Sequence, residues 1–183
     1  MIVGALVRTD GEEIAMSDNA FEAAGIHAEQ NVAITMRDGV TLRANLFRPA
    51  ESGPVPALVL RIPYNKDAAQ TYVYAHPAWY ARHGYAVLVQ DSRGRYASEG
   101  EFYPLRQDGE DGFDTIEWCA AQPWCDGNVG MDGASYLGYV QWQAATGGSD
   151  YLKCIIPQVM GGDLHESPHY QGGAFQLALN ATW

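Results

Sequence analysis

The chain has few cysteines and few basic residues. Its three cysteines, Cys119, Cys125 and Cys154, are odd in number and form no C-x-x-C pair. Neither a disulfide framework nor a zinc site is therefore predicted, and the reducing cytoplasm is the expected compartment. The 11 Lys and Arg residues stand against 22 Asp and Glu residues, which gives a net charge of −11 at pH 7. This balance argues against nucleic acid and against an anionic membrane surface as the main partner.

The sequence also lacks a membrane span and a secretory signal. No apolar run approaches the length that crosses a bilayer. The first residues, MIVGALVRTDGEE, do not open on basic side chains and become acidic too early for a signal peptide. Residues 1–28 are rich in alanine and acidic residues with weak periodicity, and we expect them to form an N-terminal extension. Apolar residues make up 47% of the chain, which is enough for a substantial core.

Strand and helix patterns alternate along the remainder of the chain. Residues 31–47 alternate apolar and polar on both sides of an Asp38-Gly39 turn, which predicts an antiparallel hairpin. Near-continuous apolar runs predict buried strands at 57–62, 85–91 and 153–160, and residues 128–133 are predicted as a short strand between the last two of these. Helical periodicity predicts helices at 73–82, 107–121 and 136–146, and we interpret the acidic run from Asp108 to Glu117 as a solvated helix face. This order predicts an α/β fold with a mostly parallel sheet and right-handed crossovers.

Ser135 lies between the short strand predicted at 128–133 and the helix that follows it, in the segment GASYLG. A sharp turn between a strand and a helix exposes a nucleophilic serine and directs the helix N-terminus at a developing oxyanion. The spacing is G-x-S-x-x-G, one residue longer than the G-x-S-x-G motif of nucleophile elbows. A serine near a helix N-cap, packed beneath a glycine turn, fits these residues equally well. Taken alone, the segment leaves both interpretations open.

Four segments together resemble a known family. RIPYNK, QDSRGRYASEGEF, PWCDGNVGMDGASYLGYVQWQAA and DLHESPHYQGGAF occur in family order and resemble the cocaine esterase-like (CocE/NonD) hydrolases of the X-Pro dipeptidyl-peptidase (S15) group, which also contains α-amino acid ester hydrolases. The resemblance implies the N-terminal part of an α/β-hydrolase fold. It also implies that Ser135 is the nucleophile and that the Tyr64 hydroxyl and the Tyr136 backbone N–H stabilise the oxyanion. No metal or organic cofactor is implied.

The resemblance also predicts how the chain is divided. Residues 29–160 correspond to part of the hydrolase domain, and residues 161–183 to the start of a helical cap. On this fold the triad follows the order Ser, acid, His, so we expect the acid and the histidine beyond Trp183. Asp163, His165 and His169 follow the last predicted strand and are candidate substitutes, although a histidine in a polar loop is usually only solvated.

We interpret the loop residues Asp91, Arg93 and Arg95 as a structural ion-paired turn, and Cys125 as a packing residue. The predicted function is a serine hydrolase that cleaves a small-molecule ester, or an amide or X-Pro peptide, through an acyl-enzyme at Ser135. The alternative is a non-catalytic remnant that serves as a binding or assembly module. For a longer form of the protein, homodimer formation is left as an open alternative. A Rossmann nucleotide-binding function is disfavoured because no G-x-G-x-x-G motif follows an early strand.

Overall fold

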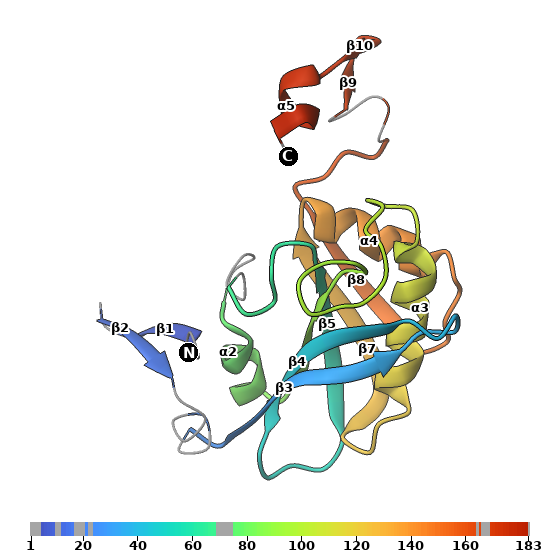
Figure 1. The fold of residues 1–183 in the computed structure, drawn as a ribbon. Helices are drawn as coiled ribbons and strands as arrows, with labels where there is room; N and C mark the ends of the chain where they lie inside the picture. The colour runs from blue at the N-terminus through green and yellow to red at the C-terminus, as the bar shows by residue number, and fades with distance from the viewer. Residues whose placement is uncertain are drawn as a thin grey trace.

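A six-stranded sheet forms the centre of the protein (Figure 1). The computed structural model describes residues 5–9, 12–16, 21, 24–68, 75–163, 165 and 169–182. The strand order is β3-β4-β6-β5-β7-β8. The strands are β3 (Ile26–Thr35), β4 (Thr41–Pro49), β5 (Val55–Ile62), β6 (Ala86–Asp91), β7 (Cys125–Ala134) and β8 (Leu152–Gln158). β3, β4 and β6 pair antiparallel, whereas β6, β5, β7 and β8 run parallel, which confirms the predicted α/β fold.

The antiparallel hairpin β3–β4 turns where the sequence predicts. Gly39 adopts φ 88°, a conformation that glycine reaches without a Cβ penalty, and Met36 N–H donates to the Val40 carbonyl at 2.8 Å. The hairpin begins at Ile26, inside the segment predicted as an extension. Earlier in that segment, β1 (Ala5–Thr9) and β2 (Glu12–Met16) pair with each other, and Phe21 is buried against Phe47. The boundary between an N-terminal extension and the hydrolase domain at residue 28 stays a prediction.

Three helices cover the two faces of the sheet. α3 (Asp108–Ala120) and α4 (Tyr136–Ala145) lie together on one side, and α2 (Pro77–Arg82) lies on the other (Figure 1). Ile116 and Cys119 of α3 pack against alternate apolar residues of the strands, while Phe47, on the opposite face of β4, packs against α2. Helix α2 begins at Pro77 rather than at Val73, which lies outside the described residues. A proline is well suited to this first helical position because its missing N–H would have no partner there.

The last strand of the sheet corrects one prediction. Residues 153–160 are predicted as a buried strand, but every residue of β8 is half-buried or exposed, and Ile156 is 46% exposed. β8 pairs only with β7 among the strands described, so it forms an edge of the sheet. An apolar run alone does not distinguish a central strand from an edge strand.

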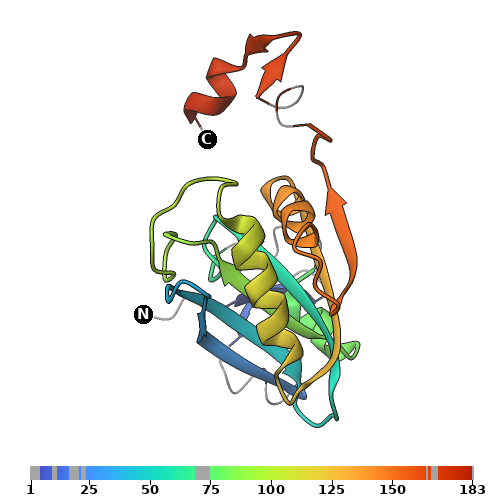
Figure 2. The same cartoon turned by 90° about the vertical axis from the view of Figure 1, so that its right-hand side faces the viewer.

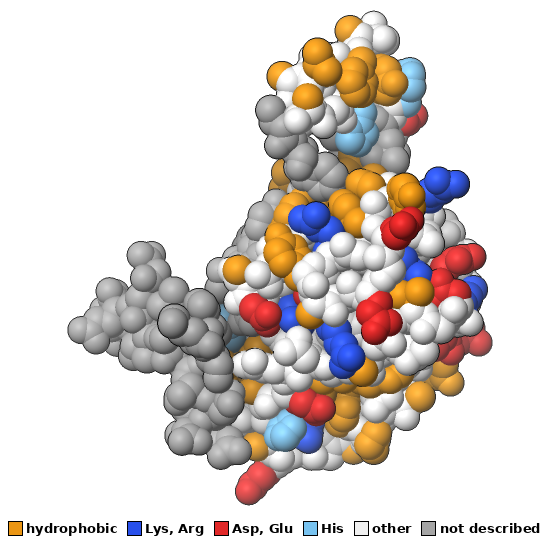
Figure 3. Space-filling view, in the orientation of Figure 1, with side chains coloured by type: hydrophobic (Ala, Val, Ile, Leu, Met, Phe, Trp, Pro, Cys, Tyr) orange, Lys and Arg blue, Asp and Glu red, His pale blue; other side chains and the backbone are white. Residues whose placement is uncertain are grey.

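A small unit follows β8. It contains β9 (Tyr170–Gln171), β10 (Ala174–Phe175) and α5 (Leu177–Thr182), and it stands clear of the sheet in both views (Figures 1 and 2). Apolar side chains lie on its surface (Figure 3), and Leu177 is 68% exposed. The assignment of residues 161–183 to a helical cap stays a prediction. Within the described part of the chain, no helix is both long and apolar enough to cross a membrane.

Candidate active site

Ser135 lies on the turn between β7 and α4, as predicted. Its backbone has φ 59° and ψ −121°, a strained conformation for a residue other than glycine. Its N–H donates to the carbonyl of Gln158 at the end of β8, at 2.8 Å. Its side chain makes no capping hydrogen bond to α4. The geometry is therefore that of a sharp strand-to-helix turn on which the half-buried serine does not cap the helix with its side chain.

Two glycines make this turn possible, and their positions explain the longer motif. Gly133 has φ 139°, and a Cβ at this position would lie 2.4 Å from the Cβ of Leu137. A Cβ on Gly138 would lie 2.7 Å from Met160 Cγ and 3.2 Å from the Gln158 carbonyl oxygen. The second glycine is therefore needed where α4 approaches the end of β8. That approach falls three residues after Ser135, one residue later than the second glycine of the G-x-S-x-G motif.

Tyr64 and Ser135 follow neighbouring parallel strands. The register pairs Val59 of β5 with Met131 of β7, and both strands end three residues further on. The carboxyl ends of parallel strands meet at one edge of a sheet, so both residues lie at the edge where α/β enzymes place their sites. Tyr64 is half-buried and packs against an apolar cluster that contains Leu137.

The loop that carries Tyr64 is held from β6 and the segment after it. Lys66 N–H donates to Asp91 Oδ1 at 2.8 Å, and Lys66 Nζ lies 3.5 Å from Asp91 Oδ2. Both side chains are fully buried. Burial raises the pKa of Asp91, and the hydrogen bond from Lys66 and its positive charge oppose that shift. Arg95 Nε donates to the Pro63 carbonyl at 3.1 Å, so the chain on each side of Tyr64 is anchored.

A buried ion-pair cluster lies behind this loop and corrects the interpretation of the acidic run. Asp108 and Asp111, at the start of α3, are 5% and 2% exposed rather than solvated. Arg61, which is completely buried, places Nη2 3.2 Å from Asp108 Oδ1 and 3.6 Å from Asp111 Oδ2. Arg93 binds Asp111 with bonds of 2.6 and 3.0 Å and Asp38 with bonds of 2.7 and 3.2 Å. These two carboxylates raise the pKa of Arg93, and the guanidinium keeps its charge.

The predicted ion-paired turn is thus correct for Asp91 and Arg93 and wrong for Arg95. The Arg95 guanidinium lies 5.1 Å from the ring centroid of Tyr96 and 5.0 Å from that of Phe102, which are cation–π contacts. The described residues show no carboxylate within ion-pair distance of it. A sequence shows that an arginine is present in a loop, but not whether a carboxylate or an aromatic ring will face it.

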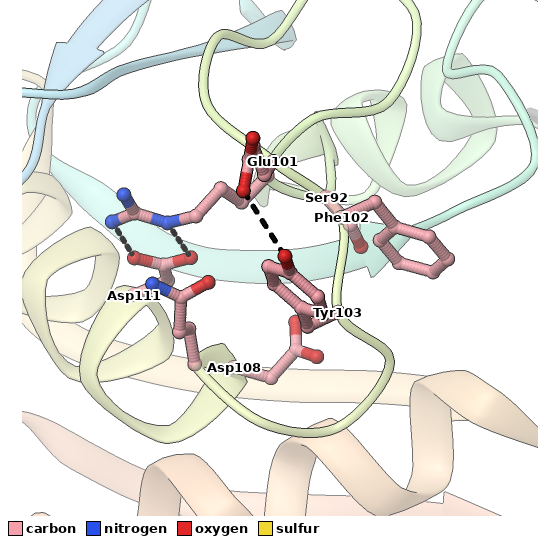
Figure 4. A pocket seen from close by; sticks show the side chains of 8 residues that line it. Ser92, Glu101, Phe102, Tyr103, Asp108 and Asp111 are labelled. Carbon is pink, nitrogen blue, oxygen red and sulfur yellow. Dashed lines mark hydrogen bonds and ion pairs between the residues drawn. The ribbon is translucent and has the colours of Figure 1, made fainter.

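A polar hollow opens between the loop after β6 and the first turn of α3 (Figure 4). Its lining includes Ser92, Tyr103 and Asp108, together with Asp111, whose carboxylate is paired with Arg93. Tyr103 donates to Glu101 at 3.2 Å across its rim. The Ser92 hydroxyl oxygen is buried without a hydrogen-bond partner among the described residues. Such a polar hollow is suited to ordered water.

The Tyr136 side chain reaches the same cluster. Its hydroxyl donates to Asp108 Oδ2 at 2.5 Å and accepts from Leu105 N–H at 3.1 Å. Burial and the neighbouring Asp108 charge raise the pKa of Tyr136, so its hydroxyl stays protonated and donates. Sequence reasoning assigned a role to the Tyr136 backbone alone and missed Asp108, because no local pattern distinguishes a buried acid from the exposed acids of the same helix.

One more carboxylate flanks the serine. Asp132 is 8% exposed, lies on β7 three residues before Ser135, and accepts a hydrogen bond from Gln158 Nε2 at 3.1 Å. Burial raises its pKa. Gln158 thus binds both Asp132 through its side chain and Ser135 through its carbonyl, which ties the end of β8 to the turn.

The structure does not bring Asp163, His165 or His169 to Ser135. Asp163 Oδ1 accepts a hydrogen bond from the His165 backbone N–H at 2.7 Å, and the His165 ring stacks on Tyr170. His169 Nδ1 binds the side-chain oxygen of Asn180 on α5. Within the described part of the chain, no hydrogen bond joins any of these three side chains to the Ser135 hydroxyl. They belong instead to the segment after β8 that stands apart from the sheet (Figure 2).

A serine on a strained strand-to-helix turn, at the carboxyl edge of a mostly parallel sheet covered by helices, defines the α/β-hydrolase fold. The family model of the X-Pro dipeptidyl-peptidase (S15 family) matches residues 38–183, and the chain belongs to this family. It is 47% identical over 156 residues to a cocaine esterase from Rhodococcus sp. (strain MB1 Bresler), covering 84% of this chain and 27% of that protein.

Solved structures agree with this assignment. A CocE/NonD family hydrolase from Staphylococcus aureus superposes with a TM-score of 0.72 at 29% identity, covering 79% of this chain and 29% of the other. An α-amino acid ester hydrolase superposes with a TM-score of 0.75 at 25% identity, covering 94% of this chain and 31% of the other. The chain therefore spans less than a third of the length of these relatives, and it matches their N-terminal part.

Proposed function

We propose that this chain carries the nucleophile and the oxyanion hole of a serine esterase. The observation that supports this most is the Ser135 backbone, at φ 59° and ψ −121°, on a turn that two sterically required glycines permit. Strain of this kind persists only where the surrounding structure holds it, and it is concentrated at functional sites. A serine that merely packed would have no need of it.

In the proposed reaction, Ser135 Oγ attacks the ester carbonyl carbon, and its proton passes to a general base. The carbonyl oxygen becomes an oxyanion that accepts hydrogen bonds from the Tyr64 hydroxyl and the Tyr136 N–H. Collapse of this intermediate expels the alcohol, which takes the proton back from the base. Water then attacks the acyl-enzyme by the same route and releases the acid.

The general base and its acid partner come, in this proposal, from the part of the relatives that the chain does not cover. On this fold they follow the nucleophile in the order acid, histidine. Asp163, His165 and His169 stand in that order after Ser135, but their side chains are engaged within the segment that follows β8. In this proposal the chain itself supplies the nucleophile, the oxyanion hole and the sheet that positions both.

We propose small-molecule esters as substrates, in preference to X-Pro peptides. The relative at 47% identity is named a cocaine esterase, and one structural neighbour is named an α-amino acid ester hydrolase. An ester also has a better leaving group than an amide, so it demands less of the general acid.

Hydrolysis of p-nitrophenyl acetate and p-nitrophenyl butyrate tests the nucleophile. The comparison uses this chain and a form extended through the region that its relatives contain, each with Ser135→Ala and with Ser149→Ala as the matched control. Ser149 is outside the turn, and its hydroxyl donates to Glu117 at 2.6 Å. We expect Ser135→Ala alone to abolish turnover and labelling by a fluorophosphonate probe, which requires an activated serine.

Each outcome decides between the two functions. Labelling at Ser135 in the extended form but not in this chain supports a base supplied from the uncovered region. Turnover that is unchanged in Ser135→Ala refutes the assignment of the nucleophile. If neither form is labelled or turns over an ester, the chain is instead a binding or assembly module on a hydrolase fold.

A further inference from the structure

We propose that Asp108 is a positioning residue that joins the two elements carrying the oxyanion donors. One of its carboxylate oxygens binds the residue after the nucleophile, and the other binds the end of the strand that leads to Tyr64. The inference rests on the proposed function, because it assigns to Tyr64 and Tyr136 the donor roles proposed above. It adds a residue, on a third element, that sets the distance between them.

The first connection fixes the turn. Asp108 Oδ2 accepts a hydrogen bond from the Tyr136 hydroxyl at 2.5 Å, and the Tyr136 side chain is 4% exposed. Leu105 N–H lies 3.1 Å from the Tyr136 hydroxyl oxygen and 3.2 Å from Asp108 Oδ2, so three groups meet at one point. Gln143 of α4 donates to the Leu105 carbonyl at 2.6 Å, which fixes this loop to the helix a second time. With its ring held at the far end, Tyr136 has little freedom to rotate its backbone N–H.

The second connection fixes the end of β5. Asp108 Oδ1 lies 3.2 Å from Arg61 Nη2, and the Asp108 carbonyl accepts a hydrogen bond from Arg61 Nη1 at 2.7 Å. Arg61 Nε donates to Gln90 of β6 at 2.8 Å, so the guanidinium is held from both sides. Arg61 is completely buried and lies three residues before Tyr64. A buried cation with these partners holds the end of β5 in one place.

The two buried acids at the start of α3 have different hydrogen-bond partners, which supports this role. Asp111, one turn further along, accepts both of its hydrogen bonds from Arg93, which also binds Asp38 next to the β3–β4 turn, and it lies 3.6 Å from Arg61 Nη2. Of these two acids, Asp108 is the one that accepts a hydrogen bond from the Tyr136 hydroxyl. Burying an ion pair contributes little net stability compared with apolar packing, but it specifies geometry where partners must meet at fixed points. Displacements of about 1 Å at a catalytic group cost about 100-fold in rate, so this geometry matters for an oxyanion hole.

Two variants test the inference, each with a readout that a purely structural residue would not change. Tyr136→Phe removes the hydroxyl and keeps the ring, and Asp108→Asn keeps the shape and removes the charge. Thr115→Val is the matched control, because it deletes a buried hydroxyl of the same helix that binds Gln90 and Asp111 but neither Tyr136 nor Asp108.

Hydrogen–deuterium exchange of this chain, followed on peptides spanning residues 133–139, does not depend on activity. We expect exchange at the turn to accelerate by at least about tenfold in Tyr136→Phe and in Asp108→Asn, and to stay at the wild-type rate in Thr115→Val. If Tyr136→Phe does not fold, Asp108→Asn supports the same comparison, and the wild-type protein titrated with urea shows whether the turn opens with α3. Turn exchange equal to that of the wild type in a folded variant overturns the proposal.

Steady-state kinetics, measured on a form of the protein that hydrolyses p-nitrophenyl esters, give the second readout. Active sites are counted with the fluorophosphonate probe, and kcat per site is compared with KM. We expect kcat to fall by at least about tenfold in both variants with KM nearly unchanged, because only the transition state needs aligned donors. An unchanged kcat per site overturns the positioning role. If the wild type neither labels nor turns over, the proposed function fails, and the exchange experiment still decides whether Asp108 holds the turn.

Discussion

Replacing Gly133 by alanine would strain the turn in two ways at once. The residue adopts φ 139°, which side chains other than hydrogen rarely permit. Its new Cβ would also lie 2.4 Å from the Cβ and 2.5 Å from the Cδ2 of Leu137. A side-chain rotation moves Cδ2 away, but Cβ is attached to the backbone of α4. The helix itself would have to shift.

The expected loss of stability is the sum of the backbone strain and the steric clash with Leu137. A residue held in a disfavoured backbone conformation costs about 1–3 kcal/mol. Overpacking a filled core costs about another 1–3 kcal/mol. We therefore expect Gly133→Ala to lower the free energy of unfolding by about 2–6 kcal/mol, a large part of the ~5–15 kcal/mol that stabilises an ordinary domain.

The same strand offers two controls that separate the terms. Gly127 has φ 84°, and a Cβ there would meet nothing closer than Tyr151 Cδ1 at 3.9 Å, so Gly127→Ala reports backbone strain alone. A Cβ on Gly130 would lie 3.0 Å from Cys154 Sγ and 3.3 Å from Leu58 Cδ2, so Gly130→Ala reports crowding alone.

Urea unfolding followed by tryptophan fluorescence measures all three variants against the wild type. We expect Gly133→Ala to lose more stability than either control, with an unchanged dependence on urea. In a form of the protein that the fluorophosphonate probe labels, Gly133→Ala should also lose labelling of Ser135, since a shifted α4 moves the Tyr136 N–H. A stability loss no greater than that of Gly127→Ala would show that the contact with Leu137 does not restrict this position.

Three further changes have defined outcomes. Arg61→Met leaves the buried Asp108 carboxylate without its cation, and urea unfolding should show a loss of about 3–5 kcal/mol; a loss below ~1 kcal/mol would contradict the buried pairing. Tyr64→Phe should lower kcat for p-nitrophenyl butyrate by about 100- to 1,000-fold with little change in KM, because the hydroxyl acts on the oxyanion; an effect on KM alone would refute this role. Burial, and then the charge of Arg82, lower the pKa of His76 from 6.5 to about 4. The unfolded chain then binds a proton that the folded chain does not, so stability should decrease by about 3 kcal/mol as the pH falls from 6.5 to 4. His76→Asn keeps a capping acceptor and does not titrate, so unfolding measured across this pH range should lose that decrease; an equal acid sensitivity in the variant would assign it to other groups.

Much of the fold was predictable because its signals are local. The Asp38-Gly39 turn, the apolar strands and the periodicity of α3 and α4 each arise from neighbours in sequence. The limits of these elements were less predictable. Helix α2 begins later than its periodicity suggests, because Pro77 and the capping side chain of His76 set its start. An apolar run identified β8 as a strand but not its degree of burial, since burial depends on which other elements pack against it.

The candidate site was likewise predictable only in part. The position of Ser135 was predictable because it lies between a strand and a helix, whereas the roles predicted for Ser135 and Tyr64 came from the family resemblance. Topology brings the ends of β5 and β7, which lead to these two residues, to one edge. Asp108 was assigned to a solvated face together with Asp114. Both acids occur in one run of similar residues, yet Asp108 is buried against Arg61, whereas Asp114 binds the half-exposed Arg37.

The sequence by itself determined the order of strands and helices and the position of the serine, because hydrophobic period and turn chemistry act over a few residues. Only the tertiary structure decided which acids meet which cations and which hydroxyl supports the turn. Arg61, Asp108 and Tyr136 are separated by 47 and 28 residues, and no local preference relates them. Their contact arises when α3 and α4 pack on the same face of the sheet, where the exclusion of water makes each of these polar groups depend on the others.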